Sequence, residues 1–221
     1  MKIAVFDFDG TLYPFDTLPF LCKQLKSNSR FTYYRVMTTL VLLYVIYKLK
    51  IISGEIIKER ALFTFMKSFR GFNEEEINDF FRNAYQLMKK DLNPEVVKEA
   101  ETLKASGYIL VVVSGACKPL VNFLGEDLGF DLVIGTEFSL NEGILKAEED
   151  ITYISGENKA AALLKILPSE EINFQESFAF ADSYSDISIL EMVGNPVAVN
   201  PERELYKLAV EKNWRVMGKP K

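Results

Sequence analysis

The chain of 221 residues is long enough for one sizeable core and a smaller accessory domain, and its 48% hydrophobic and 26% charged residues are ordinary for a globular enzyme. It contains no histidine, which excludes His-based catalytic triads, His-ligated zinc and phosphohistidine chemistry. Carboxylates are therefore the expected proton carriers. Cys22 and Cys117 are too few for a disulfide framework, and the first apolar run ends in an aspartate, so we expect a cytoplasmic protein without a signal peptide.

The net charge of −5 is unevenly distributed along the chain. Residues 21–70 hold ten lysines and arginines against two glutamates, which gives +8 for that segment and −13 for the rest. Such asymmetry indicates a separate module that attracts anions. A charged face that only improves solubility is an equally good interpretation.

The chain begins with an apolar run, residues 2–6, that predicts a buried strand. Asp7 and Asp9 follow it directly, and Gly10 then allows the backbone to turn. Two carboxylates at i and i+2 of an extended chain point the same way and repel by about 4 kcal/mol at about 4 Å and an effective dielectric near 20. We expect a cation or a shared proton to compensate them; the alternative is a solvated turn.

A helical block comes next, because residues 15–92 show helical patterns and no convincing strand. Asn73 and Glu76 have the spacing of a capping box, which predicts a helix start. Asn93 with a proline after it predicts another helix start, and Gly107 closes that helix.

Strands and helices then alternate to the end of the chain. The predicted strands cover residues 108–113, 132–134, 177–181 and, as the last one, 196–200. A hairpin is predicted over 138–146 around Asn141. Helices are predicted after the first of these strands to about residue 128, over 158–167, and from the strand 177–181 to residue 194. The alternation predicts an α/β fold with a doubly wound, Rossmann-like parallel sheet. Residues 1–14 and 93–221 would form this core, and 15–92 an inserted helical domain.

Three further segments place polar side chains where a strand or loop meets a helix, at the edge where such sheets bind ligands. Ser114 and Gly115 follow a buried strand, which indicates an anion site or only a helix N-cap. Lys159 in the first turn of a predicted helix opposes the helix dipole, so it either contacts an anion or is an exposed surface lysine.

The last of these segments carries two acids. Asp182 follows a strand, and Asp186 lies at the start of the next helix, where it would cap the helix, orient Lys159, or both. With Asp7 and Asp9, Asp182 makes a set of carboxylates without His or Cys nearby. Such hard oxygen ligands predict Mg²⁺ rather than zinc.

Together these motifs resemble the haloacid dehalogenase-like hydrolase superfamily, and the helical insertion resembles the C1-type cap of its phosphoserine-phosphatase-like branch (subfamily IB). The motifs are Asp-x-Asp-Gly-Thr at 7–11, Ser-Gly at 114–115, Lys159 and Asp-Ser-x-x-Asp at 182–186. The resemblance implies that Asp7 is the nucleophile that forms an aspartyl-phosphate and that Asp9 is the general acid and then the base. It also implies that Asp7, Asp182 and the backbone carbonyl of Asp9 hold Mg²⁺.

The remaining motif residues would serve the phosphate: Thr11, Ser114, Gly115 and Lys159 would bind it, and Asp186 would position Lys159 or metal-bound water. The implied activity is Mg²⁺-dependent hydrolysis of phosphomonoesters. A phosphotransferase, a phospho-accepting signalling domain and an inactive binding protein are the alternatives. A small phosphorylated metabolite or a phospholipid headgroup is the expected partner, and no nucleic acid is expected; the sequence does not predict the oligomeric state.

Substrate choice would rest with the cap, where the chain departs from phosphoserine phosphatases. The first motif of those enzymes resembles Asp-x-Asp-Ser-Thr, whereas this chain has Gly10 in place of the serine. Asp16 stands near the place of their cap glutamate and Phe65 near that of their cap arginine, with Arg60 and Arg70 close by. Phosphoserine is thus possible as substrate but not favoured.

The most apolar stretch, residues 36–47, is too short to span a bilayer, which needs about 20 residues. Basic residues and tyrosines border it. This pattern fits peripheral membrane contact through the cap, and with it a lipid phosphate such as phosphatidylglycerophosphate as substrate. It fits a buried cap helix equally well.

Overall fold

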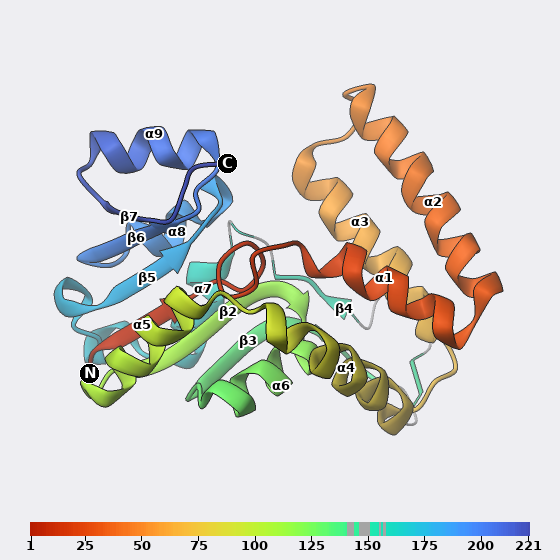
Figure 1. Cartoon of the computed structure of the whole chain (residues 1–221), viewed down its shortest axis with the longest axis horizontal. Coiled ribbons are helices and arrows are strands. Elements are labelled where there is room, and N and C mark those ends of the chain that lie inside the picture. Colours follow the sequence, from red (N-terminus) through yellow and green to blue (C-terminus); the bar gives the residue numbers. More distant parts are fainter. Residues whose placement is uncertain (141–143, 146–150, 155, 157) are drawn as a thin grey trace. The chain divides into compact units, whose positions relative to one another are not determined.

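The computed structural model describes residues 1–140, 144–145, 151–154, 156 and 158–221, and the chain divides into two compact units. The sheet unit comprises Met1–Phe15, Tyr85–Thr136 and Ile154–Lys221, and the helical unit comprises Asp16–Ala84 and Glu137–Tyr153. Figure 1 labels the elements of both.

The strands of the described residues form one seven-stranded sheet in the order β4-β3-β2-β1-β5-β6-β7. They are β1 (Ile3–Phe6), β2 (Ile109–Cys117), β3 (Leu132–Phe138), β4 (Ile151–Thr152), β5 (Phe178–Ala181), β6 (Asn195–Val199) and β7 (Arg215–Met217). Every neighbouring pair is parallel except β3 and β4, which are antiparallel. The predicted fold class, a doubly wound parallel sheet with a helical insertion, is confirmed.

The centre of the sheet is apolar on both faces, as a parallel sheet requires. All four residues of β1 are buried, and the Phe6 ring stacks on that of Phe180 in β5 with centroids 4.4 Å apart. The helices of this unit are α5 (Pro94–Ala105), α6 (Lys118–Leu128), α7 (Lys159–Ile166), α8 (Ile187–Leu190) and α9 (Arg203–Glu211). The predicted start of α5 is confirmed, because the Asn93 side chain accepts a hydrogen bond from the Glu95 N–H and Pro94 begins the helix.

Two predictions about this unit are wrong. The strand expected to end at residue 113 continues to Cys117, with a register shift against β3 after Val113, so Ser114 is not a helix N-cap. The strand β6 is not the last, because α9 and β7 follow it. A strand of three residues at a sheet edge gives little periodic signal.

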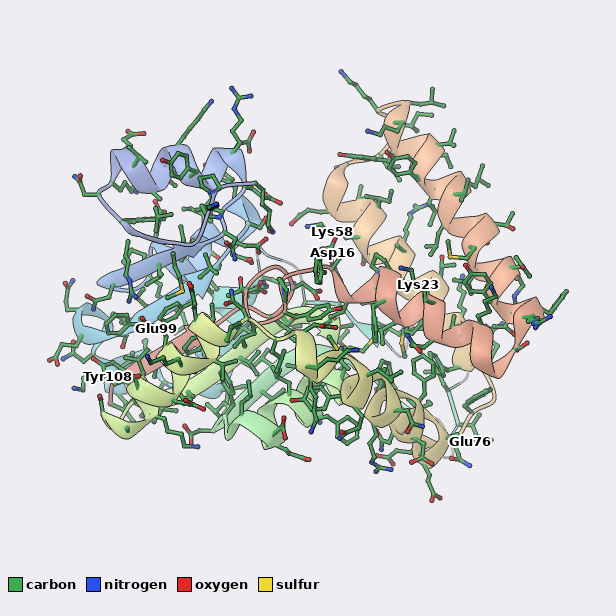
Figure 2. All side chains as sticks on the ribbon, in the orientation of Figure 1. Asp16, Lys23, Lys58, Glu76, Glu99 and Tyr108 are labelled. Carbon is green, nitrogen blue, oxygen red and sulfur yellow. The ribbon has the colours of Figure 1, made fainter. Side chains whose placement is uncertain are left out.

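The helical unit contains α1 (Thr17–Asn28), α2 (Arg30–Lys48), α3 (Gly54–Met66) and most of α4 (Glu74–Met88), whose last four residues group with the sheet unit. The predicted capping box is confirmed: Asn73 Oδ1 accepts from the Glu76 N–H and Glu76 Oε2 from the Asn73 N–H, both at 2.9 Å, and Figure 2 shows Glu76 at the start of α4. Among the described residues no helix meets the length and hydropathy that crossing a bilayer requires.

The core of the helical unit is aromatic. Phe65 and Phe69 lie with ring centroids 5.3 Å apart, and both contact Phe80 and Phe81. The unit also includes β4, which the sequence did not predict, and residues 141–143 of the predicted hairpin lie outside the described residues. The prediction that residues 15–92 form a cap domain stays a prediction.

Candidate active site

The motif residues gather because three neighbouring strands end together. Strand β1 lies between β2 and β5, so Asp7 directly after β1, Ser114 near the end of β2 and Asp182 directly after β5 share one edge of the sheet. The Asp7 N–H donates to the Phe180 carbonyl at 2.9 Å, which fixes the first carboxylate beside β5. This is the edge where doubly wound sheets bind ligands.

Three carboxylates and one ammonium group form the buried centre of the site. Single oxygens of Asp7, Asp182 and Asp186 all lie within 4.8 Å of one another. Lys159 begins α7, and its Nζ lies 2.6 Å from Oδ1 of Asp7 and 2.6 Å from Oδ1 of Asp186. These four residues are at most 6% exposed. The structure therefore excludes the exposed-lysine interpretation of Lys159.

Burial and nearby charges shift the pKa values of Asp7 and Lys159. Burial raises the pKa of Asp7 well above its usual range; Lys159 opposes this, and the charges of Asp186 and Asp182 add to it. Burial alone would lower the pKa of Lys159, but the charges of Asp186 and Asp7 and its hydrogen bonds to both raise it above the ordinary value. Lys159 therefore carries its positive charge between the two carboxylates.

The residues present fit a hard divalent cation. The donors are oxygens alone, they converge within 4.8 Å, and burial raises the pKa of Asp182 as well, a penalty on the charged form that a cation relieves. A second ammonium group already lies here: Lys221 Nζ donates to Asp182 Oδ2 at 2.5 Å. No sequence pattern indicated Lys221, because nothing local relates it to a carboxylate 39 residues earlier.

A tight turn follows Asp7 and sets the approach of the next residues. The Gly10 N–H donates to the Tyr13 carbonyl at 2.6 Å, and the Tyr13 N–H donates to the Phe8 carbonyl at 2.9 Å. Gly10 has φ +84°, and a Cβ on it would lie 2.1 Å from Asp182 Oδ2. The glycine thus serves both the turn and the close approach of Asp182, so a serine at this position would not fit without a shift.

The other core motif residues lie in the same unit. The carboxylate of Asp9, half-buried in the turn, is not part of the acidic cluster; its expected metal contact was through the backbone carbonyl. Thr11 is fully buried, and its Oγ1 has no hydrogen-bond partner in the part of the chain that the structure describes. Buried Ser114 accepts from the Ala116 N–H at 3.0 Å, and the Gly115 carbonyl accepts from Thr136 Oγ1 at 2.8 Å.

The four substrate candidates lie in the helical unit. Figure 2 shows Asp16 at the start of α1, where it is the exposed N-cap residue. Its side chain makes no capping bond. Arg60 and Arg70 are also exposed. Phe65 is completely buried in the aromatic core. Its position is that of a packing residue, while Asp16, Arg60 and Arg70 have the exposure that a ligand contact needs.

Comparison with known proteins identifies the family. The model of the haloacid dehalogenase-like hydrolase family matches residues 4–191. The chain belongs to this family. Residues 4–191 include every motif residue of the site, so the resemblance seen in the sequence is confirmed.

Relatives of this hydrolase include proteins named as phosphatases. A phosphoserine phosphatase of Methanocaldococcus jannaschii is 32% identical over 47% of this chain and 48% of its own length. A probable phosphatase of Mycobacterium tuberculosis is 32% identical over 58% of this chain and 45% of its own length. An inhibition of morphological differentiation protein of Streptomyces azureus is 29% identical over 67% of this chain and 54% of its own length. The chain spans about half the length of these curated relatives.

Solved structures share the fold. A protein of unknown function from Bordetella pertussis superimposes with a TM-score of 0.81 at 20% identity, covering 98% of both chains. A substrate-bound phosphoserine phosphatase superimposes with a TM-score of 0.65 at 20% identity, covering 99% of this chain and 94% of its own. The predicted likeness to the phosphoserine-phosphatase branch is thereby confirmed at the level of fold.

Proposed function

We propose that this hydrolase is a Mg²⁺-dependent phosphomonoesterase that works through an aspartyl-phosphate on Asp7. The observation that carries the proposal is the buried cluster in which Asp7 lies within 4.8 Å of two further carboxylates and 2.6 Å from the Lys159 ammonium. A buried carboxylate that faces other carboxylates has little structural use. The same arrangement is expected of a nucleophile beside a cation site.

The reaction would proceed in two displacements at phosphorus. A carboxylate oxygen of Asp7 attacks the phosphorus, the bond to the ester oxygen breaks, and Asp9 donates a proton to the departing alcohol. Asp9 then takes a proton from water, whose oxygen attacks the same phosphorus and releases inorganic phosphate and the Asp7 carboxylate. Asp9 suits both steps because it is less buried than Asp7.

Asp7, Asp182 and the backbone carbonyl of Asp9 would hold the Mg²⁺. When bound, the ion supplies positive charge that lets a phosphate dianion approach a carboxylate. Asp186 Oδ1 lies 2.6 Å from Lys159 Nζ in an ion pair that helps to hold the ammonium group in place.

Fixed donors of the chain would bind the transferred phosphoryl group. Lys159 provides a permanent positive charge next to Asp7. The Thr11 hydroxyl is buried and lacks a partner among the described residues, and a phosphate oxygen would supply one. Ser114 and the irregular backbone at Gly115 add donors at the end of β2.

A small phosphorylated metabolite is the proposed substrate class. Phosphoserine is one candidate, because relatives and structural neighbours include phosphoserine phosphatases. A lipid phosphate is a second candidate, favoured by one observation: the apolar helix α2 is buried only at Val36. The site that recognises the substrate stays a prediction, and Asp16, Arg60 and Arg70 are the candidate residues for substrate contact.

The test is phosphate release from a panel of phosphomonoesters with Mg²⁺ present. The panel contains p-nitrophenyl phosphate, phosphoserine, sugar phosphates, nucleotides and phosphatidylglycerophosphate. We expect turnover that EDTA abolishes and that Asp9→Asn lowers by about a hundredfold or more. The matched control is Asp79→Asn, which removes an exposed carboxylate on α4 and should leave the rate unchanged.

Three results would contradict the proposal. Turnover that survives in Asp9→Asn would exclude Asp9 as the general acid. A folded, Mg²⁺-binding protein that releases no phosphate but transfers it to added alcohols would be a phosphotransferase, and one that keeps a stable phosphoaspartate would be a signalling domain.

A further inference from the structure

The helical unit exposes large apolar side chains on one side of α2 and on the turn that joins α2 to α3. We call six of them the hairpin face: Val41, Leu42, Tyr44, Val45, Leu49 and Ile51. Leu49 and Ile51 are 66% and 67% exposed, although ordinary globular proteins expose such side chains singly rather than as a group. Figure 1 shows α2 and α3 as the two arms of this hairpin.

The members of the hairpin face that belong to α2 lie on one side of the helix. Val45 lies nine residues, or about two and a half turns, after Val36, so the two side chains point in opposite directions. Val36 is the buried one, on the side where α2 packs against α1 and α3. Phe31, 77% exposed, and Tyr34 extend the opposite side toward the start of α2. The helix is thus apolar on both sides but covered on one, whereas an apolar helix is normally surrounded.

The charges of α1, of α2 and of the turn after α2 have one sign. Residues 17–54 contain no aspartate or glutamate, and their six basic residues are all exposed: Lys23, Lys26, Arg30, Arg35, Lys48 and Lys50. Lys48 lies over the Tyr44 ring at 5.3 Å from its centroid, so apolar, aromatic and cationic groups are mixed at the end of α2. This mixture suits the boundary between acyl chains and anionic headgroups, where aromatic rings and lysine stems both find favourable surroundings.

We propose that the hairpin face docks on an anionic phospholipid bilayer, with α2 along the surface and Leu49 and Ile51 among the acyl chains. A second copy of the chain is a poorer occupant, because a symmetric pairing of this side of α2 would bring the basic residues of α2 from both copies together, and α2 contains no aspartate or glutamate to pair them. The proposal does not rest on the phosphatase activity.

The test is co-sedimentation of the full chain with phosphatidylcholine vesicles that contain or lack phosphatidylglycerol. We expect binding only to the anionic vesicles, at low salt, and weaker binding as salt is raised. Val45→Glu/Leu49→Glu should lower the affinity by about tenfold or more, because it places charge on the inserted side. Ile166→Glu/Val210→Glu makes the same change at exposed apolar residues of α7 and α9 and should bind like the unchanged protein.

A second pair of variants tests the charges without touching apolar packing. Lys48→Gln/Lys50→Gln should weaken binding and its salt dependence, whereas Lys165→Gln/Lys207→Gln, two exposed lysines of the sheet unit, should not. Asp7→Asn should bind vesicles normally, which separates docking from catalysis.

Three results would overturn the proposal: no binding of the full chain to anionic vesicles at low salt, equal losses in the hairpin and control variants, or a dimer in sedimentation that Val45→Glu/Leu49→Glu dissociates while vesicles bind nothing.

Discussion

In the sheet unit, four charged side chains at the ends of β1 and β5 and at the starts of α7 and α8 are almost completely buried. In the helical unit, large aliphatic and aromatic side chains of α2 are more than one-third exposed. Each arrangement reverses the usual placement, and each has a free-energy cost that packing elsewhere in its unit must offset. Residues placed against the usual rule at a cost in stability are expected at functional sites.

The two reversals differ in how tightly the protein holds them. The buried charges are fixed by ion pairs of 2.6 Å between Lys159 and two carboxylates. The exposed apolar side chains have only solvent on one side, so they gain nothing from the fold. Removing a buried charge should therefore perturb the whole unit, while changing an exposed apolar residue should alter binding alone.

The largest effect is expected for Lys159→Met. The change leaves two buried carboxylates without their cation, and breaking a buried ion pair by removing one partner costs about 3–5 kcal/mol of unfolding free energy. Urea unfolding without Mg²⁺ measures it. Lys165→Met, at an exposed position of the same helix, is the control and should change stability by less than about 0.5 kcal/mol. Equal stabilities of the two variants would show that Lys159 does not hold the cluster together.

A second contrast lies within the helical unit. Phe65 is completely buried and Leu42 is 60% exposed. We expect Phe65→Ala to lower the unfolding free energy by about 3–5 kcal/mol through lost packing and a cavity, and Leu42→Ala to change it by less than about 0.5 kcal/mol. Thermal or urea unfolding of the two variants decides it. A large loss from Leu42→Ala would mean that the hairpin face is covered in solution.

The sequence was sufficient for the parallel sheet and for the order of the site residues, for a physical reason. The apolar runs before Asp7 and Asp182 report strand ends, and parallel strands bring those ends to one edge. Capping residues such as Asn73 and Asn93 bind neighbours within three residues, so local spacing reveals them.

Other features depend on contacts between distant residues. The contact of Lys221 with Asp182 and the pairing of the three-residue strand β7 with β6 have no local signature. The strand end after residue 113 was misplaced because β2 continues through an irregular stretch whose Gly115 carbonyl is bound by Thr136 of β3. Residues 36–47 fit burial and exposure equally, since both sides of α2 are apolar and periodicity cannot tell which one is covered.

A smaller effect is expected for Gly10→Ala. The new methyl group would meet Asp182 Oδ2 at 2.1 Å and would also force an L-residue to φ +84°. Gly107→Ala is the control, because Gly107 has φ +81° with nothing within 4 Å of the added Cβ. Both variants should lose about 1–2 kcal/mol of unfolding free energy from the backbone, but only Gly10→Ala should also weaken Mg²⁺ binding. Calorimetry measures the Mg²⁺ binding of both variants. If Gly10→Ala binds Mg²⁺ as the unchanged protein does, Asp182 can move aside freely.

The smallest effect is expected for Lys221→Met. The Lys221 ammonium lies 2.5 Å from Asp182 Oδ2, and its side chain is 44% exposed, so the pair contributes little to stability but occupies a carboxylate proposed to bind Mg²⁺. Removing this competitor should raise the Mg²⁺ affinity by about threefold to tenfold, the range that about 0.7–1.4 kcal/mol of coupling gives. Calorimetry and the rise of the melting temperature with Mg²⁺ both measure it, with Lys219→Met as the exposed control. If the affinity stays the same, the ion and the ammonium group do not compete for Asp182, and the oxygen that binds the metal is then the one that Lys221 leaves open.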